Sequence, residues 1–258
     1  MPQTPAPQTP ILETRTLVKR FGGLLATDHV SLQLHGDEVH ALIGPNGAGK
    51  TTLIGQLSGE LRPDEGQVLI AGEDVTTLPV PERARRGLGR SYQITQFLAE
   101  FSALENVMLA ALSNTGSAFG AWSPLMRERS VVERAMNALE TVGLGDRARR
   151  SAGAMGHGEH RQLEIAMALA LEPKMLLLDE PLAGMSGSES ERMVQLLQEL
   201  RSRYPILLIE HDMDAVFALA DRISVLVYGR VIATGTPEEI RNNPEVRTAY
   251  LGDEEMVA

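Results

Sequence analysis

The sequence contains no cysteine among its 258 residues. Disulfides, thiolate catalysis and cysteine-based metal sites are therefore excluded, and a reducing compartment is the simplest location. Long apolar runs are missing too. Because no stretch of about 18 apolar residues occurs, we expect no segment that spans a membrane.

Positive charge is scarce. Lys and Arg total 24 against 34 Asp and Glu, which gives a net charge of −10 at pH 7. This balance argues against a nucleic-acid partner held by general charge attraction. Residues 1–10 lack the basic and apolar regions of a signal peptide, so we expect a disordered tail. With 43% hydrophobic residues, the remainder can form one large domain, over residues 11–258.

A glycine-rich stretch follows the apolar strand predicted over residues 39–43. Its residues are Gly44, Pro45, Asn46, Gly47, Ala48, Gly49, Lys50, Thr51 and Thr52. They fit the phosphate-loop pattern GxxxxGK[ST], in which backbone N–H groups at a helix start cradle phosphates. Lys50 would reach the β- and γ-phosphates, and the Thr51 hydroxyl would bind Mg²⁺. The alternative is a structural glycine turn, and the strand before the loop and the helix predicted over 50–58 favour the nucleotide site.

The N-terminal part alternates apolar and polar residues. We expect two or three antiparallel strands over residues 12–34, with turns at Gly22-Gly23 and Thr27-Asp28. A strand over 66–71, a short helix over 82–86 and a strand over 88–93 follow. Phe21 ends the first strand, where it is either a platform for a nucleotide base or a core or edge residue. From the residues alone, the second interpretation is favoured.

The middle of the chain has helical periodicity over residues 102–112 and 131–142, around a loop over 113–124. We therefore predict a helical subdomain, over residues 95–171, inserted between core segments 11–94 and 172–258. The cluster Arg147, Arg149 and Arg150 lies inside it and is expected to be a solvated face.

Strands and helices alternate in the last third. The predicted strands cover residues 174–179, 206–210, 223–228 and 230–233, the last two forming a hairpin at Gly229. The predicted helices cover residues 190–204, 212–220, 237–242 and 244–251. This alternation predicts an α/β fold with a mostly parallel sheet covered on both faces.

Two carboxylates, Asp179 and Glu180, end the buried strand predicted over residues 174–179. Ligands of open α/β sheets bind outside the carboxyl ends of the strands. Asp179 would therefore lie near Mg²⁺, and Glu180 would face the water that attacks the γ-phosphate. The alternative is a pair of charges before the next helix, which the phosphate loop disfavours.

These residues together resemble the ATP-binding subunits of ABC transporters, and the resemblance runs from Leu17 to Leu251. It implies a P-loop ATPase core with an N-terminal antiparallel β-subdomain and an inserted α-helical subdomain. That family has a glycine-rich signature at a helix start, which matches Met155 and the four residues Gly156, His157, Gly158 and Glu159. The resemblance implies that these four bind the ATP held by a partner subunit. Gly156 stands where the family usually has Ser, which removes one hydrogen-bond donor.

The resemblance assigns three further residues. Gln93 would contact Mg²⁺ and the nucleotide, His211 would bond the γ-phosphate and orient the water, and Phe21 would stack on adenine. One departure is Ser186, where the family often has Asp in a segment that would cross the dimer interface.

The local sequence of residues 19–23, 41–46 and 235–246 is similar to that of the ATPase subunits of bacterial branched-chain amino-acid importers. Urea and amide importers and the lipopolysaccharide exporter ATPase share much of it and remain alternatives. The resemblance implies ATP and Mg²⁺ as cofactors. As partners it implies a second ATPase subunit, polytopic permease subunits and, indirectly, a solute-binding protein. It implies peripheral attachment to the cytoplasmic face of the inner membrane.

Two rival functions belong to other classes. A soluble ABC-type ATPase acting on DNA or ribosomes usually carries two cassettes or long basic insertions, which this chain lacks. A P-loop kinase is disfavoured by the long spacing between Lys50 and Asp179, by the signature-like helix start and by His211.

Overall fold

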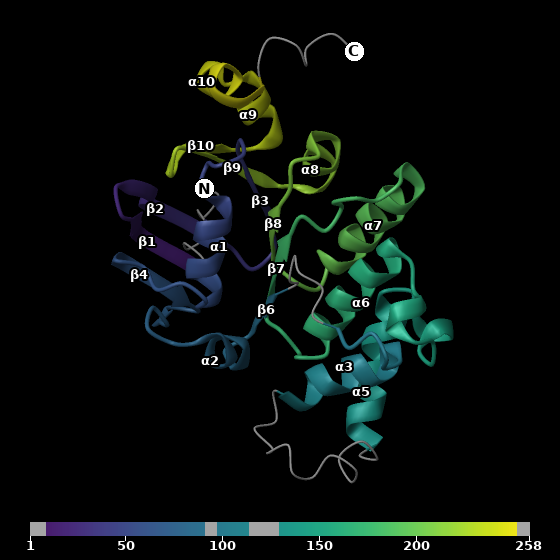
Figure 1. Cartoon of the computed structure of the whole chain (residues 1–258). Coiled ribbons are helices and arrows are strands. Elements are labelled where there is room, and N and C mark those ends of the chain that lie inside the picture. Colours follow the sequence, from purple (N-terminus) through teal and green to yellow (C-terminus); the bar gives the residue numbers. More distant parts are fainter. Residues whose placement is uncertain (1–8, 91–96, 114–128, 252–258) are drawn as a thin grey trace, which may run out of the picture. The chain divides into compact units, whose positions relative to one another are not determined.

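The computed structural model describes residues 9–90, 97–113 and 129–251, which form two compact units (Figure 1). Unit 1 combines residues 1–83 and 201–258, and unit 2 is formed by residues 84–200. This division follows contacts within the chain, and the insertion over residues 95–171 stays a prediction. Among the described residues, no helix is both long and apolar enough to cross a bilayer.

Unit 1 contains an antiparallel sheet in the order β2-β1-β4-β5. Its strands are β1 (Leu12–Phe21), β2 (Leu24–Leu34), β4 (Glu65–Ile70) and β5 (Glu73–Asp74). The chain turns between β1 and β2 at Gly22 and Gly23, as predicted. The turn predicted at Thr27-Asp28 is wrong, because both residues lie within strand β2. Thr27 is buried there and its hydroxyl donates to the Gln56 side chain at 3.0 Å, a tertiary contact that the local pattern does not contain.

A second sheet of unit 1 is mostly parallel. Strand β3 (Val39–Ile43) pairs in parallel with β8 (Ile206–Ile209) and β9 (Arg222–Val227), and β9 pairs antiparallel with β10 (Arg230–Gly235). All five residues of β3 are buried. His40 on β3 bonds the Gln33 carbonyl and the Ser224 hydroxyl, each at 2.8 Å. Burial lowers the pKa of His40 to about 4, so the ring is neutral.

The helices of unit 1 pack around these strands. They are α1 (Lys50–Ser58), α2 (Val80–Arg85), α8 (Met213–Leu219), α9 (Pro237–Asn242) and α10 (Pro244–Val246), followed by a π-helical turn over Arg247–Leu251. The bounds of α1 and α9 are those predicted. The helix predicted over 244–251 divides into α10 and the π-helical turn. The apolar residues of β3 and β9 form one core cluster with buried side chains of α8, α9 and α10, such as Val216, Ile240 and Val246.

Arg83 is a buried cation at the far end of α1 from the phosphate loop. Its Nη1 donates to the carbonyls of Gln56 and Leu57 at 2.6 and 2.7 Å, and its other nitrogens donate to Thr76 and Leu78. A cation at the carboxyl end of a helix also complements the helix dipole. Burial lowers the pKa of Arg83 to about 10, so the guanidinium remains charged at neutral pH.

Unit 2 joins a short parallel strand pair to helices. Strand β6 (Leu88–Arg90) pairs with β7 (Met175–Asp179). The helices are α3 (Ala103–Ser113), α5 (Arg129–Thr141), α6 (His157–Leu169) and α7 (Gly187–Leu200), with 3-10 turns at Gly145–Arg147 and Ala152–Ala154. Strand β6 confirms residues 88–90 of the strand predicted over 88–93, whereas residues 91–93 and residues 114–124 of the predicted loop lie outside the described residues. Helix α7 begins at Gly187, earlier than the predicted Ser190, because Ser186 and Glu189 form a cap that we did not predict.

Candidate functional site

The phosphate loop, residues 44–49, connects β3 to α1 in unit 1. Its glycines have positive φ, with Gly44 at +152°, Gly47 at +79° and Gly49 at +105°. A Cβ on Gly44 would lie 2.0 Å from the Leu226 carbonyl oxygen, and one on Gly49 would lie 2.2 Å from that of Ala26. Side chains are therefore excluded at these two positions by both conformation and space.

The backbone around the loop holds it in place. The Gly229 amide, in the turn between β9 and β10, donates to the Ala48 carbonyl at 2.8 Å. The Gly229 carbonyl accepts from the Asp28 amide on β2, also at 2.8 Å. The sequence predicted the hairpin at Gly229 but not its contact with the phosphate loop, since the partners are far apart along the chain.

Lys50 and the start of α1 provide positive charge. The Lys50 ammonium donates to the carbonyls of Gly44 and Pro45 at 2.5 and 3.1 Å, so it lies over the loop. In the described chain, no side-chain oxygen caps α1 at Gly49 and no acidic residue occupies its first turn. A helix start of this kind attracts anions through its amides and its dipole. Thr51 follows with an exposed side chain.

Phe21 is 50% exposed at the end of β1, and Leu24, which pairs with it on β2, is 66% exposed. The Lys19 ammonium lies 5.8 Å from the centre of the Phe21 ring. A core position is therefore excluded, and stacking on adenine stays a prediction.

His211 follows β8 in unit 1 with its side chain 60% exposed. Its Nδ1 lies 3.7 Å from a carboxylate oxygen of the buried Glu210. Helix α8 is capped by Asp212, whose carboxylate accepts from the Ala215 amide at 3.0 Å. Asp212, and not His211, therefore caps α8. The His211 imidazole lies near the carboxyl end of β8, where ligands of α/β sheets bind.

In unit 2, Asp179 is buried at the end of β7 and Glu180 follows it. The backbone of Glu180 has φ +49°, a left-handed conformation that costs a residue other than glycine about 1–3 kcal/mol. The Ala183 amide closes this turn by donating to the Glu180 carbonyl at 3.1 Å. Five other described residues that are not glycine also have a positive φ, so this conformation by itself assigns no role to Glu180.

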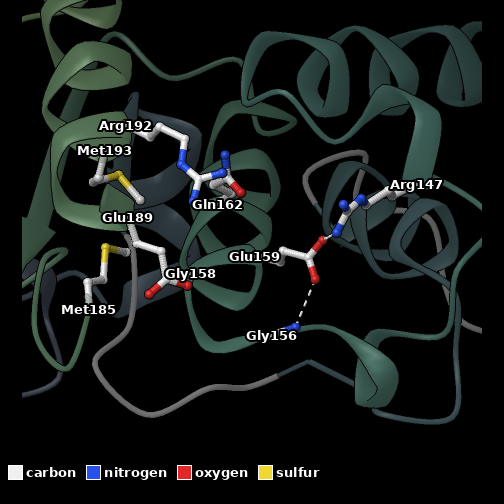
Figure 2. A pocket seen from close by; sticks show the side chains of 9 residues that line it. All are labelled: Arg147, Gly156, Gly158, Glu159, Gln162, Met185, Glu189, Arg192 and Met193. Carbon is white, nitrogen blue, oxygen red and sulfur yellow. Dashed lines mark hydrogen bonds and ion pairs between the residues drawn. The ribbon is translucent and has the colours of Figure 1, made fainter. Parts of the chain in front are cut away.

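Residues 156–159, here called the signature turn, form the start of α6. The Gly156 amide donates to the Glu159 carboxylate at 2.8 Å, so a side chain of the signature turn itself accepts from its first amide. Arg147 forms an ion pair with the same carboxylate (Figure 2). Arg150 lies 3.9 Å from it. All three arginines are exposed, so the predicted solvated face is confirmed, and Arg147 also pairs with Glu159 across that face. Sequence reasoning missed this pairing because an arginine run gives no sign of its partner.

A pocket of about 260 Å³ lies beside the signature turn in unit 2 (Figure 2). Its lining combines charged side chains, thioethers and the backbone of two glycines, from Arg147, Gly156, Gly158, Glu159, Gln162, Met185, Glu189, Arg192 and Met193. Three of the lining residues, Gly156, Gly158 and Glu159, are among the four that the resemblance assigns to the ATP of a partner subunit.

The predicted site residues divide between the two units. The phosphate loop, Phe21 and His211 belong to unit 1, whereas Asp179, Glu180 and the signature turn belong to unit 2. Gln93 lies outside the described residues. The Thr51 hydroxyl in unit 1 and the Asp179 carboxylate in unit 2 are each a kind of ligand that Mg²⁺ accepts, and their shared role in holding it stays a prediction. Among the residues that the structure describes, no group of three or more His, Cys, Asp or Glu side chains could hold a metal by itself.

Comparison with known families agrees with this site. Residues 27–183 match the ABC transporter family, and residues 230–256 match the family described as branched-chain amino acid ATP-binding cassette transporter. The first match contains the phosphate loop, the signature turn, Asp179 and Glu180.

Curated relatives match almost the whole chain. The high-affinity branched-chain amino acid transport ATP-binding protein LivG of Escherichia coli is 40% identical over 253 residues, which cover 95% of this chain and 98% of LivG. The corresponding protein BraF of Pseudomonas aeruginosa is 42% identical over 251 residues, with the same coverage.

Solved structures give the same assignment. The ADP conformation of an ATP-binding cassette of an ABC transporter superposes with a TM-score of 0.85 at 32% identity, covering 95% of this chain and 99% of that one. A nucleotide-free cassette gives a TM-score of 0.84 at 34% identity, with 95% and 100% covered. The α/β P-loop fold predicted from the sequence is thereby confirmed. On these grounds the chain belongs to the ATP-binding proteins of ABC transporters, and it is an ATPase of that family.

Proposed function

We propose that this chain drives the import of branched-chain amino acids through membrane permease subunits. The observation that carries the proposal is the match of residues 230–256 to the branched-chain amino acid transporter family, outside the part that ABC transporters share. The names of LivG and BraF support the same substrate class. The chain would act at the cytoplasmic face of the inner membrane, with a solute-binding protein delivering the substrate to the permease.

For ATP binding, the phosphate loop and the start of α1 supply amides, and Lys50 supplies a positive charge near the β- and γ-phosphates. Phe21 would stack on the adenine. Thr51, Asp179 and Gln93 would hold Mg²⁺, which when bound offsets charge on the phosphate oxygens.

For hydrolysis, Glu180 would accept the proton of the attacking water or orient it, and His211 would donate to the γ-phosphate. In a head-to-tail pair of ATPase subunits, Gly156, His157, Gly158 and Glu159 of one subunit would face the ATP of the other. Amides aimed at the γ-phosphate stabilise the charge that develops in the transition state. Gly156 offers no hydroxyl, so this contact would rest on backbone groups.

A Glu180→Gln variant tests the hydrolytic role. The carboxamide keeps the shape of the side chain but is a poor base, so ATP binding should persist while turnover falls about 100-fold or more. The dimer closed on ATP should accumulate, measured by size-exclusion chromatography with Mg²⁺-ATP. Hydrolysis at the wild-type rate would remove Glu180 from the mechanism.

Substrate class requires the intact complex. The chain should co-purify with polytopic permease subunits, and in proteoliposomes its ATPase rate should rise when leucine or isoleucine is supplied with the solute-binding protein. Urea, amides and lipopolysaccharide are the matched comparisons. Stimulation by one of these instead of the amino acids would refute the proposed substrate.

A further inference from the structure

The signature turn touches a second segment of unit 2, the glutamate loop, defined here as residues 180–186 between Glu180 and α7. Two side chains make the connection. His157 reaches the loop from the signature turn, and Glu189, in the first turn of α7, reaches the signature turn from the other side.

Glu189 contacts both segments with a single carboxylate. Its Oε2 accepts from the amide and the hydroxyl of Ser186, at 3.0 and 2.6 Å. Its Oε1 faces Gly158 so closely that a Cβ at that residue would lie 2.9 Å from the oxygen, so a side chain there would require Glu189 to move. Figure 2 shows the Glu189 side chain reaching toward Gly158. Hydrogen bonds from Ser186, and to a smaller extent from the Gly158 backbone, lower the pKa of Glu189, so it is ionised at neutral pH.

His157 makes the second contact. Its Nε2 lies 2.9 Å from the Ala183 carbonyl oxygen, which can only accept, so this nitrogen carries the proton. The neighbouring Gly184 has φ +75°, and a Cβ there would lie 2.9 Å from the same nitrogen. The loop therefore passes close enough to bond His157 because residue 184 has no side chain.

We propose that Glu189 is a positioning residue for ATP hydrolysis, which fixes Gly158 of the signature turn to the loop that begins at Glu180. The inference rests on the proposed function, in which the signature turn contacts ATP on the partner subunit. In one chain, a single carboxylate then contacts Gly158, which would meet the partner's ATP, and Ser186, at the end of the loop that begins at the residue proposed to activate water. A shift of the signature turn moves the glutamate loop.

The competing explanation is that Glu189 only caps α7. Ser186 and Glu189 form one half of a capping box, in which the Glu189 carboxylate accepts from the Ser186 amide, and this bond stabilises the helix start. Unit 2 contains a matched example. At the start of α3, the Ser102 amide and hydroxyl both donate to Glu105 at 2.7 Å, and these bonds lower the pKa of Glu105. Glu105 thus provides a capping carboxylate whose described contacts are with Ser102.

The experiment compares E189A, E189Q and E105A in the full-length chain, with ATPase kinetics, ATP affinity and thermal unfolding measured for each. Both alanine variants lose a cap and should lower Tm by a similar amount. E189A should reduce kcat about tenfold with the ATP dissociation constant within about twofold of wild type, because a loosened turn mainly misplaces groups needed in the transition state. E105A should keep the wild-type kcat. E189Q still offers an acceptor to Ser186, so it should recover most of the rate.

A wild-type kcat in E189A, or a loss that E105A shows equally, would overturn the proposal and leave Glu189 as a helix cap. If E189A does not fold, E189D replaces it, since aspartate keeps the charge but falls one methylene short of Gly158; a wild-type kcat in E189D would likewise overturn it. Failure of the proposed function gives a different result: the wild-type chain itself would not hydrolyse Mg²⁺-ATP, which would refute both.

Discussion

The starts of α1 and α6 are both glycine-containing helix entries assigned to phosphate, but they are supported in different ways. At α1, backbone groups surround the loop, and glycines are required at residues 44 and 49 by positive φ and by nearby carbonyls. At α6, side chains support the turn, through Glu159 on Gly156 and Glu189 beside Gly158. The first site is preorganised by the main chain and left open. The second is supported by charged side chains of both signs, because Arg147 pairs with Glu159 and Arg192 lines the pocket beside Glu189.

This difference predicts unequal tolerance to the same mutation. Gly49→Ala adds both positive-φ strain and a 2.2 Å clash with the Ala26 carbonyl, and should lower the free energy of unfolding by about 4 kcal/mol. Gly156 has φ −78° and ψ 169°, and a Cβ there would meet nothing nearer than 3.7 Å. Gly156→Ala should therefore cost less than about 0.5 kcal/mol. Urea unfolding of both variants makes the comparison, and equal losses would contradict the difference between the two sites.

Lowering the pH should weaken the surroundings of the phosphate loop before it weakens the contacts of Glu189. His40, on the strand that leads into the phosphate loop, has a folded pKa of about 4 against an ordinary value of 6.5. Between these values the unfolded chain binds more protons, so stability is lost as the pH falls through this window. The loss from pH 7 to pH 5 should be about 2 kcal/mol. The pKa of Glu189 lies below its ordinary 4.5, so its contacts should persist to lower pH.

Urea unfolding at pH 7 and pH 5 measures this loss, and His40→Gln is the control. Glutamine does not titrate, so the variant should lack most of the pH dependence, whatever its stability at pH 7. An unchanged slope in the variant would show that other groups are responsible.

The smallest expected effect comes from restoring a side chain at the second site. The backbone of Gly156 is extended and its Cβ position is open, so Gly156→Ser can place a hydroxyl at the helix start. Serine is a better N-cap than glycine by a few tenths of a kcal/mol. The variant should raise Tm slightly and, by adding a donor to the γ-phosphate, raise kcat. Thermal unfolding and ATPase assays test this, and a fall in kcat would show that the backbone contacts alone are better placed.

Local signals in the sequence predicted the elements around the phosphate loop closely. The bounds of β3 and α1 agree with the structure because an apolar run, a glycine turn and a helix start follow one another. The predicted start of α7 was wrong although its capping residues, Ser186 and Glu189, have the spacing of a capping box in the sequence. This signal was present and missed.

Other features depend on residues that meet only in the folded chain. The pairing of Arg147 with Glu159 and the contact of Glu189 with Gly158 join different elements, and neither leaves a periodic trace in the sequence. The same holds for the Leu226 and Ala26 carbonyls that enclose the phosphate loop. The chemistry of the candidate site was predictable from the residue types, whereas its support was not.

Arg83 adds a mechanical consequence. It grips the carboxyl end of α1 through the carbonyls of Gln56 and Leu57, and it is also the last residue of the first segment of unit 1. Arg83 itself lies in α2, so the carboxyl end of α1 is tied directly to that helix. A displacement of α2 would therefore act on the helix whose opposite end is assigned to phosphate.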